Sequence, residues 1–180
     1  MAVTANFRQE NESRMNAEGL DVPGPQEAVS AAITTSRPRL LVFHINDSTD
    51  DQVIFQAACK EAEIPFDWQT AETAAGGISY LESVAVRSRT HAVRWPDLVV
   101  LDLAMPGESG LKVLEYIRAK PELRRLVVIV LTGHPDPAMA EEAVKLGANS
   151  VLRKPTDFGD TIKLMTALYE MWRMAKRPSM

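Results

Sequence analysis

Apolar runs of strand length alternate along the chain with segments whose apolar residues recur at helical spacing. Runs such as 40–45 and 126–131 are apolar apart from His44, which is typical of strands covered on both faces. The predicted strands are 40–45, 66–70, 98–103, 126–131 and 149–153, and the predicted helices are 50–62, 72–86, 109–119, 136–147 and 157–175. Five strands alternating with helices predict a doubly wound α/β domain with a parallel sheet.

Polar residues stand where four of these strands end. Asn46 and Asp47 follow the first strand, and Asp102 lies near the end of the third, before a turn. Thr132 follows the fourth strand and Lys154 follows the fifth. Parallel strands point their carboxyl ends the same way, so these side chains are expected at one edge of the sheet. In open α/β sheets ligands bind at that edge, which makes it the candidate functional site.

The composition changes before the first strand. Residues 1–37 are rich in Asn, Glu, Ser, Pro and Gly and have no sustained periodicity apart from a short possible helix at 26–34. We interpret them as a flexible N-terminal extension; a docking segment for a partner and a helix packed on the domain are the alternatives. The predicted domain is 38–176, with a tail at 177–180.

Charge and composition narrow the class of partner. The formal net charge is -4, and no Lys/Arg stripe is interleaved with aromatic residues, which argues against nucleic-acid binding and favours protein partners. The single Cys59 excludes an internal disulfide and fits a reducing compartment. No apolar run approaches about 18 residues and the N-terminus has no apolar signal core, so we predict a cytoplasmic protein without membrane attachment.

Several short motifs occur together in one order and spacing. They are Asn46-Asp47, Asp102 within the segment 101–107, Gly110, Leu131-Thr132-Gly133, and Gly147-Ala148-Asn149 leading to Lys154-Pro155. With them, residues 39–172 resemble the receiver domains of response regulators in bacterial two-component signalling. This resemblance implies a flavodoxin-like sheet of strand order 2-1-3-4-5.

Three further features resemble single-domain receivers of the cyanobacterial phytochrome type. They are the Asp50-Asp51 start of the first helix, the long loop 87–94, and Tyr169 with Trp172 near the end. The resemblance implies a sensor histidine kinase as partner, and a photoreceptor kinase such as a bacteriophytochrome is one candidate. Only residues 173–180 follow Trp172, so no separate output domain is expected.

The resemblance also implies the role of each site residue. Asp102 would accept a phosphoryl group as an acyl phosphate, Lys154 would pair with one phosphoryl oxygen, and the Thr132 hydroxyl would bind another. Such a protein is a phosphoacceptor that assists its own phosphorylation and dephosphorylation, not an enzyme acting on a separate substrate.

The implied cofactor is Mg²⁺, held by Asp47, Asp102 and the backbone carbonyl of Ala104, with Asn46 as a further candidate ligand. Most such receivers have an acid at position 46. Cation affinity in oxygen sites depends on the number of charged ligands, so we predict weaker Mg²⁺ binding than in a three-carboxylate site.

Three other positions concern how phosphorylation would change the structure. Val151 stands where the family often has an aromatic residue that swings inward, so any change on phosphorylation is expected to travel through Thr132, Gly133 and the helix 136–147. His134 either influences phosphate lifetime or is simply solvated. The family implies a cis peptide bond between Lys154 and Pro155.

The last predicted helix carries more apolar surface than one core contact needs. Its apolar residues spread over far more than a roughly 100° stripe and are Leu164, Met165, Ala167, Leu168, Tyr169, Met171, Trp172 and Met174. A homodimer through this helix explains the excess, and coverage by the N-terminal extension is the alternative.

Two other functions are alternatives to phosphoryl transfer. A phosphorylation-independent adaptor or dimerisation module is suggested by Asn46 and Val151. A nucleotide- or flavin-binding protein is disfavoured because no Gly-rich loop follows the first strand.

Overall fold

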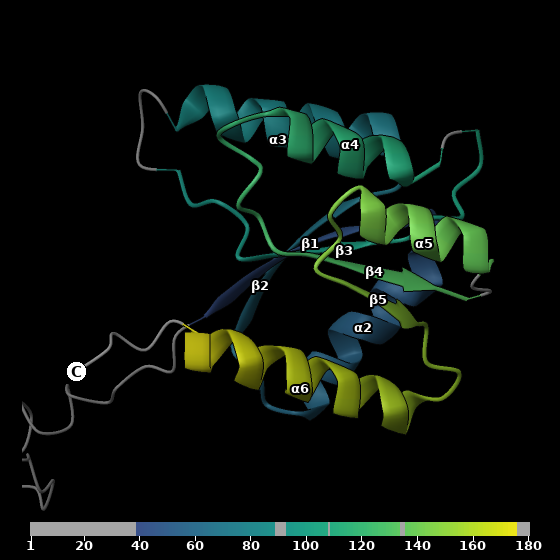
Figure 1. Ribbon diagram of the computed structural model, residues 1–180. Helices are drawn as coiled ribbons and strands as arrows, with labels where there is room; N and C mark the ends of the chain where they lie inside the picture. Colours follow the sequence, from purple (N-terminus) through teal and green to yellow (C-terminus); the bar gives the residue numbers. More distant parts are fainter. Residues whose placement is uncertain (1–38, 89–92, 108, 134–135, 176–180) are drawn as a thin grey trace, which may run out of the picture. The chain divides into compact units, whose positions relative to one another are not determined.

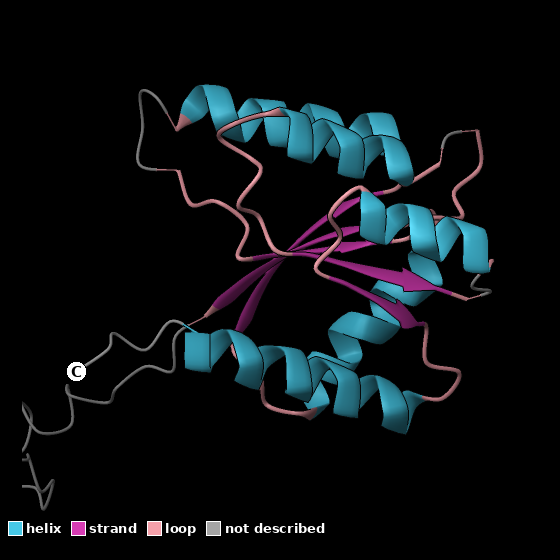
Figure 2. Cartoon of the chain, in the orientation of Figure 1, coloured by secondary structure: helices cyan, strands magenta, loops and turns pink. Residues whose placement is uncertain are grey.

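The fold is a parallel sheet covered by helices on both faces (Figures 1 and 2). The computed structural model describes residues 39–88, 93–107, 109–133 and 136–175. The strands are β1 Leu40–Ile45, β2 Phe66–Ala71, β3 Leu98–Leu101, β4 Val128–Thr132 and β5 Ser150–Arg153. All neighbouring pairs are parallel in the order β2-β1-β3-β4-β5, which confirms the predicted doubly wound fold. The predicted extension 1–37 and tail 177–180 lie outside the described residues.

The helices divide between the two faces of the sheet. They are α2 Thr49–Glu61, α3 Ala74–Arg87, α4 Leu111–Ala119, α5 Pro137–Lys145 and α6 Phe158–Ala175. Figure 1 shows α3, α4 and α5 on one face and α2 with α6 on the other. None of the helices in the described part of the chain is long and apolar enough to cross a membrane.

The strand β1 shows why the central strands do not alternate between apolar and polar residues. Phe43 and Ile45 belong to the core beneath α3 and α4, whereas Leu40 and Val42 belong to the core beneath α2 and α6. Every residue of β1, β3 and β4 is buried. A strand with no face toward solvent has no position at which a polar residue would alternate.

Local capping sets where the helices begin. The Ser48 hydroxyl accepts a hydrogen bond from the Asp51 N–H at 3.2 Å at the start of α2. The Asp136 carboxylate accepts one from the Ala138 N–H at 3.0 Å at the start of α5. Gly147 follows α5 with φ +95°, a left-handed conformation that glycine adopts without steric cost.

The strand β3 ends two residues before its predicted boundary. The Asp102 N–H still donates to the Ile45 carbonyl at 2.9 Å, but the Asp102 carboxylate then accepts from the Ala104 N–H at 3.0 Å. This side-chain hydrogen bond turns the chain. Asp102 therefore stands on the loop immediately beyond the strand.

Candidate functional site

Asp102 and Lys154 form a buried ion pair at the carboxyl edge of the sheet. Lys154 Nζ donates to Asp102 Oδ2 at 2.7 Å, and only 8% of the Asp102 side chain is exposed. The other carboxylate oxygen, Oδ1, accepts from the Ala104 N–H. A carboxylate bound in this way is fixed in orientation and charge-paired.

Thr132 lies beside this pair because β4 and β5 are neighbours. Thr132 ends β4, is buried, and pairs in register with Arg153. Its carbonyl oxygen accepts a hydrogen bond from the Lys154 N–H at 2.8 Å. The three residues predicted from strand ends, Asp102, Thr132 and Lys154, therefore meet at one place, brought there by three adjacent strands.

Asp51 is a further member of the site, and its position is not at the end of a strand. Its Oδ2 accepts a second hydrogen bond from Lys154 Nζ, also at 2.7 Å, across 103 residues of sequence. The sequence pattern presents Asp51 only as part of the Asp50-Asp51 start of the first helix. The signal that could have found it is position, because the first turn of a helix that follows β1 at the carboxyl edge lies over the site.

Asn46 faces Asp51 and is completely buried. Its Oδ1 accepts from the Ser48 N–H at 3.0 Å, which turns its amino group toward Asp51 Oδ2 at 3.3 Å. The same Nδ2 atom lies 3.5 Å from Nε2 of His44. The Asn46 carbonyl oxygen accepts from the Gln52 side chain at 2.7 Å. The Asn46 side chain is thus held by several partners within the protein.

The pKa values of Asp51 and Lys154 follow from these contacts. Burial raises the pKa of Asp51, but hydrogen bonds from Lys154 and Asn46 outweigh it and hold that pKa below its usual range. Burial lowers the pKa of Lys154, but hydrogen bonds to Asp102 and Asp51 outweigh it and raise that pKa above its usual range. At neutral pH Lys154 is therefore an ammonium and Asp51 a carboxylate.

Asp47, Asp102 and Ala104 offer oxygen atoms at this edge, and oxygen is the ligand atom that Mg²⁺ prefers. Asp47 and Ala104 are exposed, at the ends of β1 and β3, and Asp102 lies beside Ala104. Among the described residues no three Asp, Glu, His or Cys side chains come together as a metal-binding group. Mg²⁺ commonly binds through one or two carboxylates and retains water, so Asp47, Asp102 and the Ala104 carbonyl are a chemically suitable set.

The expected cis peptide bond is not found. None of the peptide bonds among the described residues is cis, so the Lys154–Pro155 bond is trans and that expectation is wrong. The trans form is the ordinary state of a peptide bond before proline. The long Lys154 side chain already reaches both carboxylates from this backbone.

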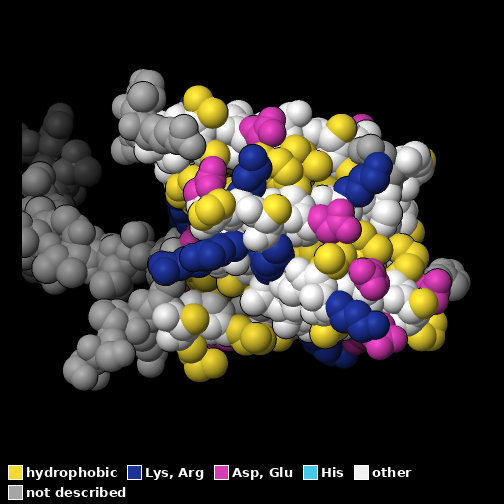
Figure 3. All heavy atoms as spheres, turned by 45° about the horizontal axis from the view of Figure 1, so that its top comes forward, with side chains coloured by type: hydrophobic (Ala, Val, Ile, Leu, Met, Phe, Trp, Pro, Cys, Tyr) yellow, Lys and Arg dark blue, Asp and Glu magenta, His cyan; other side chains and the backbone are white. Residues whose placement is uncertain are grey.

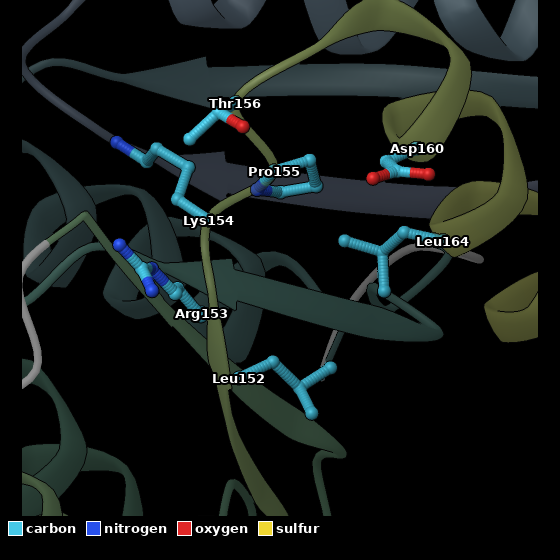
Figure 4. A pocket seen from close by; sticks show the side chains of 7 residues that line it. All are labelled: Leu152, Arg153, Lys154, Pro155, Thr156, Asp160 and Leu164. Atoms are coloured by element: carbon cyan, nitrogen blue, oxygen red, sulfur yellow. The ribbon is translucent and has the colours of Figure 1, made fainter.

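An open groove lies on the other side of Lys154, between the end of β5 and the first turns of α6. In Figure 4 the Lys154 side chain extends away from Asp160 and Leu164, which face this groove. The ammonium group is therefore directed to the carboxylates and not into the groove.

Gly110 is required by the same turn. A Cβ atom at this position would overlap the carbonyl oxygen of Asp102. Instead, the Gly110 N–H donates to the Leu103 carbonyl at 3.1 Å. The glycine lets the start of α4 approach the backbone of the site.

Four other residues named from the sequence lie away from the ion pair or outside the described residues. Val151 is half-buried and packs against the core on the α3 and α4 side. His134 lies outside the described residues. Tyr169 is buried and Trp172 packs against the core on the α2 and α6 side, with ring centroids 5.7 Å apart.

Comparison with known proteins decides the family. The sequence profile of the response regulator receiver domain matches residues 48–166. The chain belongs to this family. It is therefore a receiver domain of the two-component type, with the parallel five-stranded fold of that family.

Similar proteins include regulators associated with phytochromes. Response regulator Rcp1 of Synechocystis sp. is 24% identical over 137 residues, which cover 76% of this chain and 91% of Rcp1. The structure of the phosphorylated cyanobacterial phytochrome response regulator RcpA has a TM-score of 0.67 at 24% identity, over 79% of this chain and all of that one. The Mn²⁺-bound form of Rcp1 has a TM-score of 0.65 at 23% identity, with the same coverage.

Other alignments cover shorter parts of the relatives. A probable chemotaxis protein CheY of Rhizobium etli is 38% identical over 73 residues, which are 41% of this chain and 54% of that protein. The transcriptional regulatory protein FixJ of Azorhizobium caulinodans is 48% identical over 59 residues, which are 33% of this chain and 27% of FixJ.

Proposed function

We propose that this receiver domain accepts a phosphoryl group on Asp102 from a sensor histidine kinase and signals through protein contacts. The observation that carries the proposal is the 2.7 Å contact between Lys154 Nζ and Asp102 Oδ2, beside the end of β4 at Thr132. Family membership supports phosphorylation as the form of signalling. An acyl phosphate at the sheet edge is the modification that this arrangement suits.

In the proposed reaction a carboxylate oxygen of Asp102 attacks the phosphorus atom of a phosphohistidine. A P–O bond forms, the P–N bond breaks, and its electron pair stays with the imidazole of the kinase. Lys154 supplies a charge within reach of the transferred group, and the Thr132 hydroxyl binds one of its oxygens. A bound Mg²⁺, held by Asp47, Asp102 and the Ala104 carbonyl, would offset negative charge on the phosphoryl oxygens. The Mn²⁺-bound form of Rcp1 supports a divalent cation in this role.

Proteins are the proposed partners. On the face seen in Figure 3, acidic and basic side chains are interspersed, with apolar side chains between them. The resemblance to phytochrome response regulators supports a photoreceptor kinase as the phosphoryl donor. We place this exchange in the cytoplasm.

A homodimer through α6 is part of the proposal. Met165, Leu168 and Tyr169 of this helix are buried against the sheet, but Met171 and Met174 are 61% and 62% exposed. Two exposed methionines near the end of one helix form an apolar surface suited to a second copy.

The test is incubation with Mg²⁺ and acetyl phosphate, followed by intact-protein mass spectrometry. The expected result is the mass increase of one phosphoryl group, absent in Asp102→Asn. Equal labelling of both proteins would contradict the role of Asp102. No labelling of the wild type at high Mg²⁺ would favour a phosphorylation-independent adaptor, the second candidate, which the amide at Asn46 and the non-aromatic Val151 support.

A further inference from the structure

The Lys154 ammonium is held from two sides by side chains of different elements. Asp102 follows β3, and Asp51 stands in the first turn of α2. Both Nζ···O distances are 2.7 Å, and 16% of the Lys154 side chain is exposed. A lysine side chain is a flexible stem carrying a point charge, so one partner leaves its direction free while two partners on separate elements define it.

We propose that Asp51 is the positioning residue that holds Lys154 against Asp102, and that the Asn46–Asp51 pair supplies the acid that position 46 lacks. This inference rests on the proposed function of Asp102 and Lys154. The second carboxylate that binds Lys154 then comes from a helix and not from the end of β1.

The orientation of Asn46 makes the two positions depend on each other. The Ser48 N–H is a donor, so it requires an oxygen from residue 46 and leaves the amino group of Asn46 to face Asp51. A carboxylate at position 46 would satisfy Ser48 but would bring an oxygen within about 3.3 Å of the Asp51 oxygen, where like charges repel. An acid at one position therefore fits an amide at the other.

Asp50 provides a matched control on the same helix turn. It is exposed and makes no side-chain hydrogen bond or ion pair with any residue in the described part of the chain. Asp50→Asn and Asp51→Asn remove the same charge from the first turn of α2, so both weaken its interaction with the helix dipole similarly. Only Asp51→Asn removes the carboxylate that binds Lys154.

The first measurement needs neither Mg²⁺ nor phosphate. In ¹⁵N-labelled protein, the side-chain ammonium signal of Lys154, assigned with Lys154→Arg, reports slow exchange of its protons with water. We expect this signal in the wild type and in Asp50→Asn, and expect it broadened or lost in Asp51→Asn. A merely structural role of Asp51 would not distinguish these two variants in this way. Asp51→Ser, which removes the charge with a smaller side chain, replaces Asp51→Asn if the latter does not fold.

The second measurement is the rate of phosphorylation by acetyl phosphate at varied donor concentration. We expect Asp51→Asn to lower the rate at saturating donor by about tenfold, as for loss of one charged hydrogen bond, with little change in half-saturation. Asp50→Asn is expected to stay within about threefold of the wild type. The variant carrying both Asp51→Asn and Asn46→Asp moves the acid to the other side of the pair and should recover most of the lost rate.

These measurements distinguish the positioning role of Asp51 from the phosphoacceptor role of Asp102. If the wild type is phosphorylated but Asp51→Asn matches Asp50→Asn in both the ammonium signal and the rate, Asp51 does not position Lys154. A double variant slower than Asp51→Asn would likewise overturn the exchange between positions 46 and 51. If the wild type takes no phosphoryl group but its ammonium signal depends on Asp51, the positioning contact stands and the phosphoacceptor role is wrong.

Discussion

The buried imidazole of His44 is predicted to make the stability of the domain depend on pH under mildly acidic conditions. His44 is 1% exposed, with the rings of Phe55 and Trp68 at centroid distances of 5.2 and 5.5 Å. Its Nδ1 has no hydrogen-bond partner among the described residues. Burial, reinforced by the charge of Lys154, lowers the pKa of His44 from 6.5 to about 4, and Asp51 offsets this only in part.

The sign and size of the effect follow from proton linkage. The unfolded chain binds a proton at His44 as the pH falls through 6.5, whereas the folded domain leaves this imidazole neutral until about pH 4. The free energy of unfolding is therefore unaffected by His44 above pH 6.5, and it decreases progressively as the pH falls toward 4. The difference in pKa corresponds to a loss of roughly 3 kcal/mol in the free energy of unfolding. The stabilisation from Asp51 is lost at lower pH than that from His44. Because the folded domain holds the pKa of Asp51 below 3.8, this stabilisation is complete above pH 3.8 and is lost as the pH falls through the folded-state pKa.

The assay is urea unfolding followed by circular dichroism at several pH values between about 7 and 4.5. His44→Phe keeps a ring between Phe55 and Trp68 but cannot bind a proton. We expect its unfolding free energy to change much less over this range, so that its advantage over the wild type grows as the pH falls. Other titrating groups are common to both proteins and cancel in the comparison. Parallel pH profiles for the two proteins would refute this account of His44.

Three further predictions concern the turn, the metal site and the dimer. Gly110→Ala should lower the unfolding free energy by about 2 kcal/mol, measured by urea denaturation, because its Cβ meets backbone; Gly133→Ala, with no atom within 4 Å of the added Cβ, should change it by less than about 0.5 kcal/mol. Asn46→Asp should destabilise the Mg²⁺-free domain by about 1 kcal/mol through carboxylate repulsion and tighten Mg²⁺ binding in calorimetric titration. Met171→Lys with Met174→Lys should shift a dimer to monomers in sedimentation.

Each of these three has a result that would contradict it. Equal stability of Gly110→Ala and Gly133→Ala would show that the turn yields to an added methyl group. Unchanged Mg²⁺ affinity in Asn46→Asp would show that the amide does not limit the metal site. A dimer that persists with lysines at 171 and 174 would place the interface elsewhere.

The fold could be predicted because its signals are local. Apolar runs define the central strands, whose faces are both covered, and Ser48 and Asp136 cap the helices that they precede. Even the meeting of Asp102 with Lys154 follows from the sequence, because parallel strands bring their carboxyl ends to one edge. Residues at strand ends need no knowledge of side-chain direction to be placed there.

Asp51 and Asn46 show what only the tertiary structure decided. Whether a side chain in the first turn of α2 faces solvent, as Asp50 does, or faces Lys154 depends on how the helix is rotated against the sheet. That rotation is set by packing between α2, α6 and the sheet, not by the periodicity of α2 alone. The direction of the Asn46 amide depends in turn on competition among neighbouring donors and acceptors. The sequence by itself determined which acids reach the edge of the sheet along the strands, and three-dimensional packing decided which further acid shares the lysine.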